Sequence, residues 1–181
     1  SILFEGEHVP FATLPGMQER TMTVGGFSKS HAMTGWRIGY AIAPREILGL
    51  MQVLSIVQSF GVNSLAQKAA LYALKTQDKK VMERRDIFRE RVDYTLGRLN
   101  AIPGISCLKP GGSFYLFPNI SGTGMNSEEF TFWLLEKAKV AVIPGISFGK
   151  SGEGYVRISC AMSLKDLEKA MDRMENALKN R

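Results

Sequence analysis

Apolar residues at regular spacing divide the first part of the chain into two strands and two helices. Residues 20–27 and 37–44 are short apolar runs, rich in β-branched and aromatic residues and bounded by Gly and Pro, which predicts buried strands. Residues 45–58 and 63–74 carry apolar side chains at helical spacing, and the second helix opens with an Asn-Ser pair that suits a cap. The apolar face expected for that second helix consists of Leu65, Ala69, Tyr72 and Ala73.

A highly charged stretch, residues 77–100, follows these elements. It keeps one apolar stripe at helical spacing, which predicts a long helix that links two regions. The stripe consists of Val81, Phe88, Val92 and Leu99. Pro103 and Gly104 end the helix.

Shorter elements occupy the last third of the chain. Residues 112–120, 140–145 and 154–162 read as strands, and residues 126–139 and 163–180 as helices, the first opened by a capping box. The expected buried faces are Phe130, Trp133 and Leu134 in the first helix and Leu164, Leu167, Met171, Met174 and Leu178 in the second.

The order of these elements predicts an α/β protein with two parts. Residues 1–80 contain the end of a larger sheet-and-helix domain, and residues 81–181 contain the linking long helix and a small α/β domain. The first residues open in the middle of a strand pattern without an initiator Met, so we expect a fragment or a trimmed chain.

Composition narrows the classes of protein. A chain of 181 residues with 45 % apolar residues can fill a real core, and no apolar run approaches the ~20 residues of a membrane span. Cys107 and Cys160 lack CxxC spacing and a nearby His cluster, so neither a disulfide framework nor a zinc site is indicated. We therefore expect a reducing, cytoplasmic setting with no membrane partner.

The net charge of +6 could suit an anionic partner, and the long helix carries much of it. Its basic residues are Lys79, Lys80, Arg84, Arg85, Arg89 and Arg91. Acidic residues are interleaved at helical spacing, namely Glu83, Asp86, Glu90 and Asp93. Interleaving favours a solvated, self-paired helix face over a nucleic-acid surface, and no set of stacking aromatic residues accompanies it.

The most informative stretch is "GGFSKSHAMTGWRIGY", residues 25–40. A lysine among small residues can lose part of its hydration and act as a nucleophile or base, and an arginine can grip a phosphate in a planar fork. Lys29 with Arg37 is therefore what a pyridoxal phosphate site requires, an amine for the aldehyde and a clamp for the phosphate. A surface lysine in a turn and an arginine in a structural ion pair would give the same spacing.

The string "FSKSHAMTGWRIGY" closely resembles the lysine-site signature of class I/II pyridoxal-phosphate-dependent aminotransferases, the fold-type I family that includes aspartate and aromatic aminotransferases. The resemblance continues through residues 59–74, 109–120 and 142–161. It implies that Lys29 forms the imine with the cofactor and that Arg37 binds its phosphate. The chain would then be the C-terminal part of a fold-type I transferase.

Further roles are implied by the same resemblance. Arg157 matches the arginine that binds the substrate α-carboxylate, although an exposed strand arginine has the same local pattern. Gly26 stands where the family often has a phosphate-binding serine, and Ser28 is a weak substitute. Phe148 and the glycine after it either border the substrate or form a plain turn, while His31 has no partner that its spacing indicates.

The family resemblance also places an Asp-Glu-x-Tyr segment immediately before the position of Ser1. In the family its aspartate protonates the pyridine nitrogen and its tyrosine bonds the ring hydroxyl. The 181 residues then hold half of a site, and we expect them to be inactive alone.

The leading hypothesis is an aminotransferase that moves an amino group between an aspartate-like or aromatic amino acid and a 2-oxo acid, as a homodimer. A pyridoxal-phosphate-dependent lyase or decarboxylase of the same fold remains open, as does a transcription regulator that senses pyridoxal phosphate through an aminotransferase-like domain.

Overall fold

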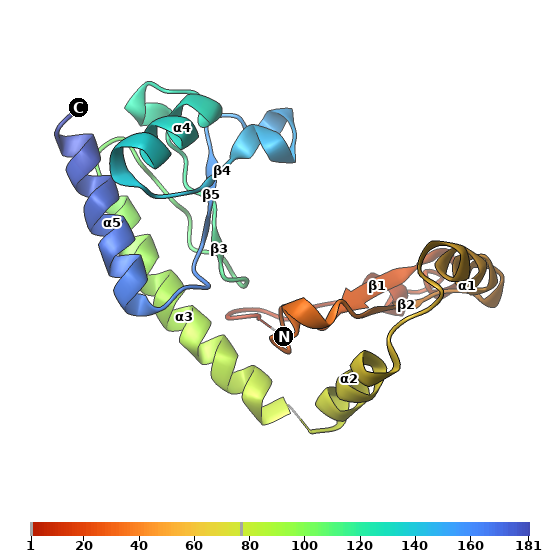
Figure 1. The fold of residues 1–181 in the computed structure, drawn as a ribbon. Helices are drawn as coiled ribbons and strands as arrows, with labels where there is room; N and C mark the ends of the chain where they lie inside the picture. The colour runs from red at the N-terminus through yellow and green to blue at the C-terminus, as the bar shows by residue number, and fades with distance from the viewer. Residues whose placement is uncertain (1, 77) are drawn as a thin grey trace. The chain divides into compact units, whose positions relative to one another are not determined.

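The computed structural model describes residues 2–76 and 78–181. They form two compact units, which we name the N-terminal unit (Gly6–Arg84) and the C-terminal unit (Ile2–Glu5 with Arg85–Arg181). Figure 1 labels the helices and strands of each unit. The long helix α3 (Asp78–Asn100) contains residues of both units, and the expected helical position Gln77 lies outside the described residues. The assignment of residues 1–80 and 81–181 to two functional domains stays a prediction.

Two strands of the N-terminal unit pair where the sequence predicts them. Strands β1 (Thr23–Gly26) and β2 (Gly39–Ile42) run antiparallel. The prediction that they are buried is wrong for this chain, because Val24 is 70 % and Ile42 63 % exposed. Within the described residues, nothing covers these apolar side chains.

Helices α1 (Arg45–Ser59) and α2 (Ser64–Thr76) follow, together with the 3-10 turns η1 (Phe11–Thr13), η2 (Gln18–Arg20) and η3 (Thr34–Trp36). Helix α1 buries none of its side chains. Helix α2 is capped by Asn63, whose side-chain oxygen accepts the backbone N–H groups of Leu65 and Ala66.

The predicted face of α2 is correct at Ala73, which is buried, and at Ala69, which is partly buried against the same cluster, but wrong at its two larger members. Leu65 and Tyr72 are 69 % and 65 % exposed, and the buried residues are Ala66, Ala70 and Ala73. Ala70 and Ala73 lie against Phe27 and Met33, which belong to the segment between β1 and β2. The small alanine side chains let the helix approach bulky neighbours closely. The helical period alone favoured the face with the larger apolar side chains.

The C-terminal unit is a three-stranded antiparallel sheet with helices packed against it (Figure 1). Strand β5 (Val156–Ser159) lies between β3 (Tyr115–Leu116) and β4 (Ile143–Pro144). The strands fall within the predicted ranges but are shorter. The helices are α4 (Ser127–Ala138) and α5 (Leu164–Lys179), and the short turns are η4 (Ser121–Thr123), η5 (Gly145–Phe148) and η6 (Lys150–Gly152).

Most members of the predicted apolar stripes meet in one core in this unit, except Val81, which belongs to the N-terminal unit, and Leu164, which is not part of the core. The most deeply buried members are Val92, Leu99, Leu116, Ile120, Phe130, Leu134, Val156, Cys160, Met171 and Met174. The capping box at α4 is also confirmed, since Asn126 and Glu129 each bond the other's backbone N–H.

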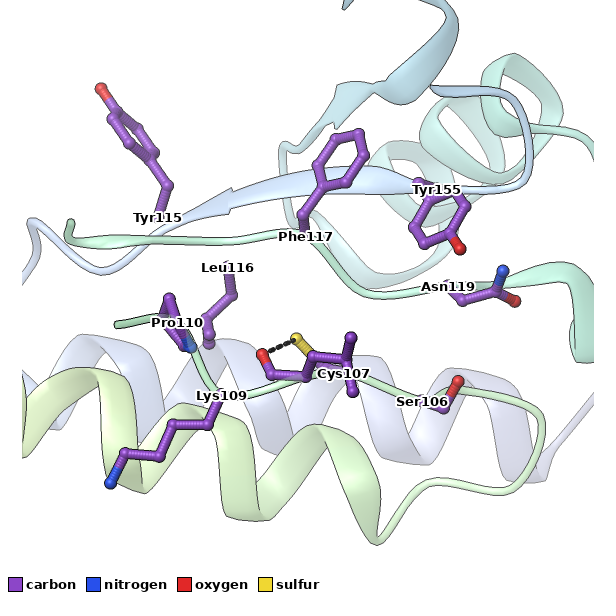
Figure 2. Close-up of a pocket in the computed structure, with 10 residues that line it drawn as sticks. Ser106, Cys107, Lys109, Pro110, Tyr115, Leu116, Phe117, Asn119 and Tyr155 are labelled. Carbon is purple, nitrogen blue, oxygen red and sulfur yellow. Dashed lines mark hydrogen bonds between the residues drawn. The ribbon is translucent and has the colours of Figure 1, made fainter. Parts of the chain in front are cut away.

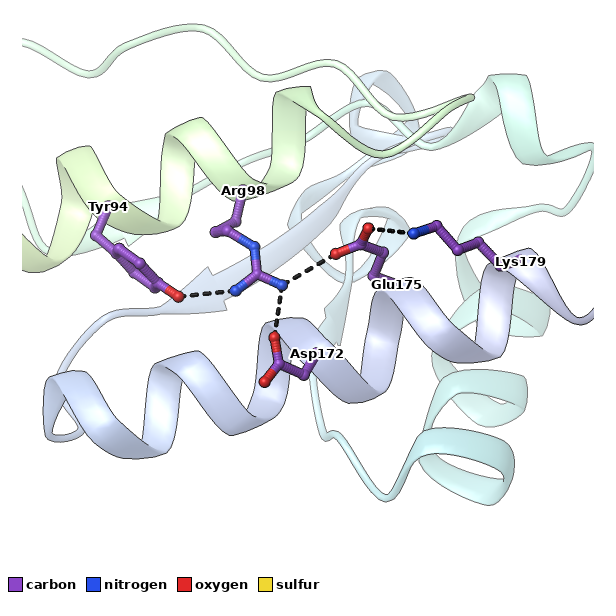
Figure 3. A network of polar contacts seen from close by, with 5 residues as sticks. All are labelled: Tyr94, Arg98, Asp172, Glu175 and Lys179. Atoms are coloured by element: carbon purple, nitrogen blue, oxygen red, sulfur yellow. Dashed lines mark hydrogen bonds and ion pairs between the residues drawn. The ribbon is translucent and has the colours of Figure 1, made fainter.

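A group of polar contacts around Arg98, which we name the arginine cluster, joins α3 to α5. Helix α5 runs alongside α3 (Figures 1 and 3). Arg98 donates from Nη2 to Asp172 at 2.7 Å and to Glu175 at 3.0 Å, and from Nη1 to the Tyr94 hydroxyl at 2.8 Å. These contacts, with Asp172 foremost, raise the pKa of Arg98 above its ordinary value.

The basic face of α3 is less self-paired than predicted. Lys80 and Glu83 form an ion pair at 2.9 Å and Arg85 and Asp86 one at 2.7 Å, but other arginines bond groups outside the helix. Arg84 donates to the Ser30 carbonyl at 3.1 Å, and Arg89 donates to the Phe4 carbonyl at 2.7 Å. Arginine reaches far and donates in several directions, so backbone carbonyls of neighbouring segments compete successfully with acidic residues on the same helix.

Candidate functional site

The predicted lysine occupies a tight loop that follows β1. The Phe27 carbonyl accepts the backbone N–H groups of His31 at 3.1 Å and Met33 at 3.3 Å, and the Lys29 carbonyl accepts that of Ala32 at 3.4 Å. The Lys29 side chain is exposed. The loop therefore has a hydrogen-bonded backbone and presents the amine to the outside.

Side chains on both sides of Lys29 hold this loop in place. Phe27 is 4 % and Met33 7 % exposed, and both pack on the alanine face of α2. Arg84 of α3 also donates to the carbonyl of Ser30, the next residue after the lysine. The backbone around Lys29 is thus held in place, although the Lys29 side chain itself is exposed.

The glycines around the lysine serve two different purposes. A Cβ on Gly25 would overlap the ring of Tyr40, and a Cβ on Gly39 would lie 2.8 Å from the Gly25 carbonyl oxygen. These two glycines are required by the close approach of β1 and β2. At Gly26 the nearest heavy atom to an added Cβ would be 3.9 Å away, and at Gly35 there is none within 4 Å, so at these two positions the missing side chain leaves room for a ligand.

Arg37 has an unusual backbone conformation. Its φ and ψ are 50° and 51°, in the left-handed region, which costs about 1–2 kcal/mol for a residue other than glycine. The guanidinium is exposed and donates from Nη1 to the Thr34 carbonyl at 2.7 Å. Strain of this kind persists where surrounding structure imposes it and is concentrated at functional sites. Lys29 precedes η3 and Arg37 follows it in the sequence, and both belong to one unit.

His31 has a partner that its spacing did not indicate. Its Nδ1 lies 2.8 Å from the hydroxyl of the adjacent Ser30, and its ring lies 5.2 Å from that of Phe27. These contacts give it a packing role in the loop. The suggested phosphate contact of the half-buried Ser28 stays a prediction.

Arg157 lies in the C-terminal unit, on the central strand β5. Its neighbours Val156 and Ile158 point into the core, so alternation along the strand places Arg157 on the opposite face. Its guanidinium lies 4.5 Å from the centre of the Tyr115 ring and 5.0 Å from that of Phe148. In the part of the chain that the structure describes, no acidic side chain is within ion-pair distance of Arg157.

The sequence did not predict the contacts of Arg157 with the rings of Tyr115 and Phe148. The sequence left Phe148 undecided between a substrate contact and a plain turn, and the structure places its ring over Arg157. Tyr115 was not singled out. Its closeness to Arg157 depends on strand register. Strand β3 pairs antiparallel with β5, and Tyr115 lies opposite Ser159, two residues from Arg157.

A pocket of about 390 Å³ opens beside the same sheet in the C-terminal unit (Figure 2). Phe117 and Tyr155, two of its aromatic walls, are stacked with ring centres 5.2 Å apart. The thiol of Cys107 lies on the opposite wall, and partial burial raises its pKa. Sequence reasoning did not find this pocket, because its walls come from segments that only the fold brings together.

The described residues offer neither a metal site nor a membrane span. Among the described residues, no three His, Cys, Asp or Glu side chains gather closely enough to hold a metal ion. Within residues 2–76 and 78–181, no helix combines the length and the apolar character needed to cross a membrane.

Comparison with known proteins gives one consistent family. The sequence model of "Aminotransferase class I and II" matches residues 2–174. An aspartate aminotransferase of Pyrococcus horikoshii is 48 % identical over 162 residues, which cover 88 % of this chain and 41 % of that protein. An aromatic-amino-acid aminotransferase of Thermococcus litoralis is 44 % identical over 172 residues, covering 94 % of this chain and 44 % of the relative.

Solved structures agree with the sequence relatives. The crystal structure of an aromatic aminotransferase from Pyrococcus horikoshii superposes with a TM-score of 0.94 at 45 % identity, covering 99 % of this chain and 48 % of that one. An aspartate aminotransferase from Rhizobium meliloti gives a TM-score of 0.91 at 38 % identity, covering 98 % and 47 %. The chain thus spans less than half the length of each of these relatives.

Proposed function

The chain belongs to the class I and II aminotransferases, and on that premise we propose that it works as part of a pyridoxal-phosphate-dependent aminotransferase. The full-length protein would move an amino group between an aspartate-like or aromatic amino acid and a 2-oxo acid. The observation that carries this proposal is the anchored loop of the N-terminal unit. It exposes the amine of Lys29 and, directly after η3, the guanidinium of Arg37, whose backbone is in the left-handed region.

The residues of that loop fit the cofactor. The exposed amine of Lys29 suits the aldehyde, and the exposed guanidinium of Arg37 suits the phosphate, with open space at Gly26. Pyridoxal phosphate, when bound, supplies an electron sink for negative charge at the substrate α-carbon. Lys29 would accept and donate a proton at its Nζ during the reaction. Arg37 would hold the phosphate end of the cofactor, so that the cofactor keeps its position relative to Lys29.

Arg157 would orient the substrate. Its guanidinium has no acidic partner among the described residues and lies against the rings of Tyr115 and Phe148, so the edge with its N–H groups is available to a ligand. A carboxylate can accept two parallel hydrogen bonds from that edge. We therefore assign Arg157 to the substrate α-carboxylate.

Two alternatives keep less support. The matched proteins are named aminotransferases, which favours amino-group transfer over a lyase or decarboxylase of the same fold and over a regulator that senses pyridoxal phosphate. We further infer a homodimer, because α1 buries none of its side chains and such apolar surfaces commonly mark protein interfaces.

The assignment of Lys29 can be tested by covalent labelling. The full-length protein is incubated with pyridoxal phosphate, reduced with borohydride and digested, and the labelled peptide is identified by mass spectrometry. We expect the label on Lys29 and its loss in Lys29→Arg, while Lys68→Arg, an exposed lysine on α2, keeps it. A label on another lysine would overturn the proposal.

A further inference from the structure

The loop that carries Phe148 is closed on itself. It leaves β4, makes the turns η5 and η6, and returns to β5, and the Gly145 N–H bonds the Tyr155 carbonyl at 2.8 Å across its base. Gly145 and Gly152 lie so close that a Cβ on either would overlap the other's carbonyl oxygen. The loop is therefore a compact body, and what fixes it to the rest of the unit decides where Phe148 lies.

Glu153 provides a side-chain attachment of this loop to α4, beside the hydrogen bond from the Ile120 N–H to the Gly154 carbonyl at 2.8 Å and the contact of the Phe148 ring with that of Phe117, 6.0 Å between centres. Glu153 accepts hydrogen bonds from the backbone N–H of Ser127 at 2.8 Å, from the Ser127 hydroxyl at 2.9 Å and from the Gly154 N–H at 2.8 Å. Ser127 is the first residue of α4 and is fully buried. A negative charge is favoured at a helix N-terminus, where backbone N–H groups lack partners within the helix.

The attachment has a consequence for Arg157. The rings of Phe148 and Tyr115 both lie against the guanidinium, with their centres 5.0 Å and 4.5 Å from its Cζ. Tyr115 is fixed by its strand, whereas Phe148 depends on the loop. If the loop moves, the guanidinium gains freedom to tilt, and a two-bond contact with a carboxylate requires its plane to be fixed.

We propose that Glu153 is a positioning residue for Arg157, which it controls by holding the Phe148 loop on the first turn of α4. The proposal rests on the proposed function, in which Arg157 binds the substrate carboxylate. Glu153 itself touches neither substrate nor cofactor. Its carboxylate fixes the loop, the loop fixes the ring, and the ring fixes the plane of the guanidinium.

Steady-state kinetics of the full-length protein test this chain of contacts. Glu153→Ala should raise KM for the amino acid on the order of tenfold and change kcat less than about twofold, since binding is weakened equally before and in the transition state. Glu153→Gln keeps an acceptor oxygen and should recover part of the loss. Glu128→Ala, an exposed acidic residue in the same first turn of α4, is the matched control and should leave KM unchanged.

Two further measurements separate this proposal from the function on which it rests. In an Arg157→Ala background, Glu153→Ala should add no further increase in KM, and an additive increase would overturn the proposal. Hydrogen exchange of the amides in residues 145–154 should be faster in Glu153→Ala than in the native protein. Unchanged exchange would also overturn it, whatever the activity. An unchanged KM in Arg157→Ala alone would instead refute the proposed role of Arg157.

Discussion

The two units of this chain bury their apolar residues to very different degrees. The C-terminal unit closes α3, α4 and α5 with its sheet around one core, in which Phe130, Leu134 and Met174 have no exposed surface. The N-terminal unit has only a small cluster around Phe27 and Met33. Its helix α1 leaves Leu50 and Val57 70 % and 73 % exposed.

This difference indicates where each unit obtains its stability. Burial of apolar surface contributes about 25 cal/mol per Å², so a unit that closes on itself can be stable through its own residues. A unit with open sheet and helix faces gains that contribution only when other protein covers them. The unit that carries Lys29 and Arg37 is the open one, so its apolar faces are available for contacts with other protein.

The largest expected effect concerns activity. We predict that the 181-residue chain, expressed alone, shows no measurable transamination of aspartate with a 2-oxo acid, while the full-length protein is active. The exposed Lys29 and Arg37 would meet the cofactor from one side only, in a unit with uncovered apolar faces. Coupled assays of both proteins with added pyridoxal phosphate measure this. Comparable turnover by the chain alone would show that its open unit is self-sufficient.

Core truncation should separate the two units next. Phe130→Ala removes a side chain with 0 % exposure and should lower the free energy of unfolding of the C-terminal unit by about 3–5 kcal/mol. Denaturant unfolding of the 181-residue chain, followed by near-UV circular dichroism, measures the change.

The controls for this prediction lie in both units. Phe132→Ala, on the same helix but 68 % exposed, and Leu54→Ala on α1, 58 % exposed, should each change the free energy of unfolding by no more than about 0.5 kcal/mol. A large loss for Leu54→Ala would show that the N-terminal unit has a packed interior of its own.

The arginine cluster of Figure 3 should have a moderate effect. Arg98→Ala removes the contacts to Tyr94, Asp172 and Glu175 and should destabilise the C-terminal unit on the order of 1–2 kcal/mol, since the cluster is partly exposed to solvent. Lys137→Ala breaks an exposed pair with Glu136 and should cost less than about 0.5 kcal/mol. Equal effects in thermal unfolding would show that the cluster adds nothing beyond a surface pair.

The smallest effect is a dependence on acid. The pKa of Glu153 is lowered by the N–H groups of Ser127 and Gly154, that of Asp166 by the Ser163 hydroxyl, and that of Glu175 by Lys179 and Arg98. A lowered pKa in the folded state means that the ionised carboxylate stabilises the fold above its ordinary pKa. That contribution is lost as the pH falls through the lowered value.

We therefore expect the melting temperature of the C-terminal unit to fall between about pH 5 and about pH 3, and to fall less steeply in Glu153→Ala. Circular dichroism melts across this range measure it. The N-terminal unit has the lowered pKa of Glu83, paired with Lys80 on an exposed helix surface, and should respond less. A melting temperature independent of pH would contradict the prediction.

The sequence by itself determined the features that depend on neighbours within a few residues. The periods of α4 and α5, the capping box of Asn126 with Glu129 and the stop at Pro103 are all local, and the structure has them where the pattern predicts them. Lys29 and Arg37 were also identified from one continuous string, although their roles remain a proposal. Helical spacing and capping hydrogen bonds act within one or two turns, which is why a single sequence reveals them.

Tertiary structure decided everything that joins distant positions. Folding selected the alanine face of α2 over Leu65 and Tyr72, since only Phe27 and Met33 show which face is covered. It likewise brought Arg89 within hydrogen-bond distance of the Phe4 carbonyl, 85 positions away, and Glu153 within hydrogen-bond distance of Ser127, 26 positions away. Side-chain reach and charge limit which partners a residue can take, but the path of the chain brings one of them within hydrogen-bond distance.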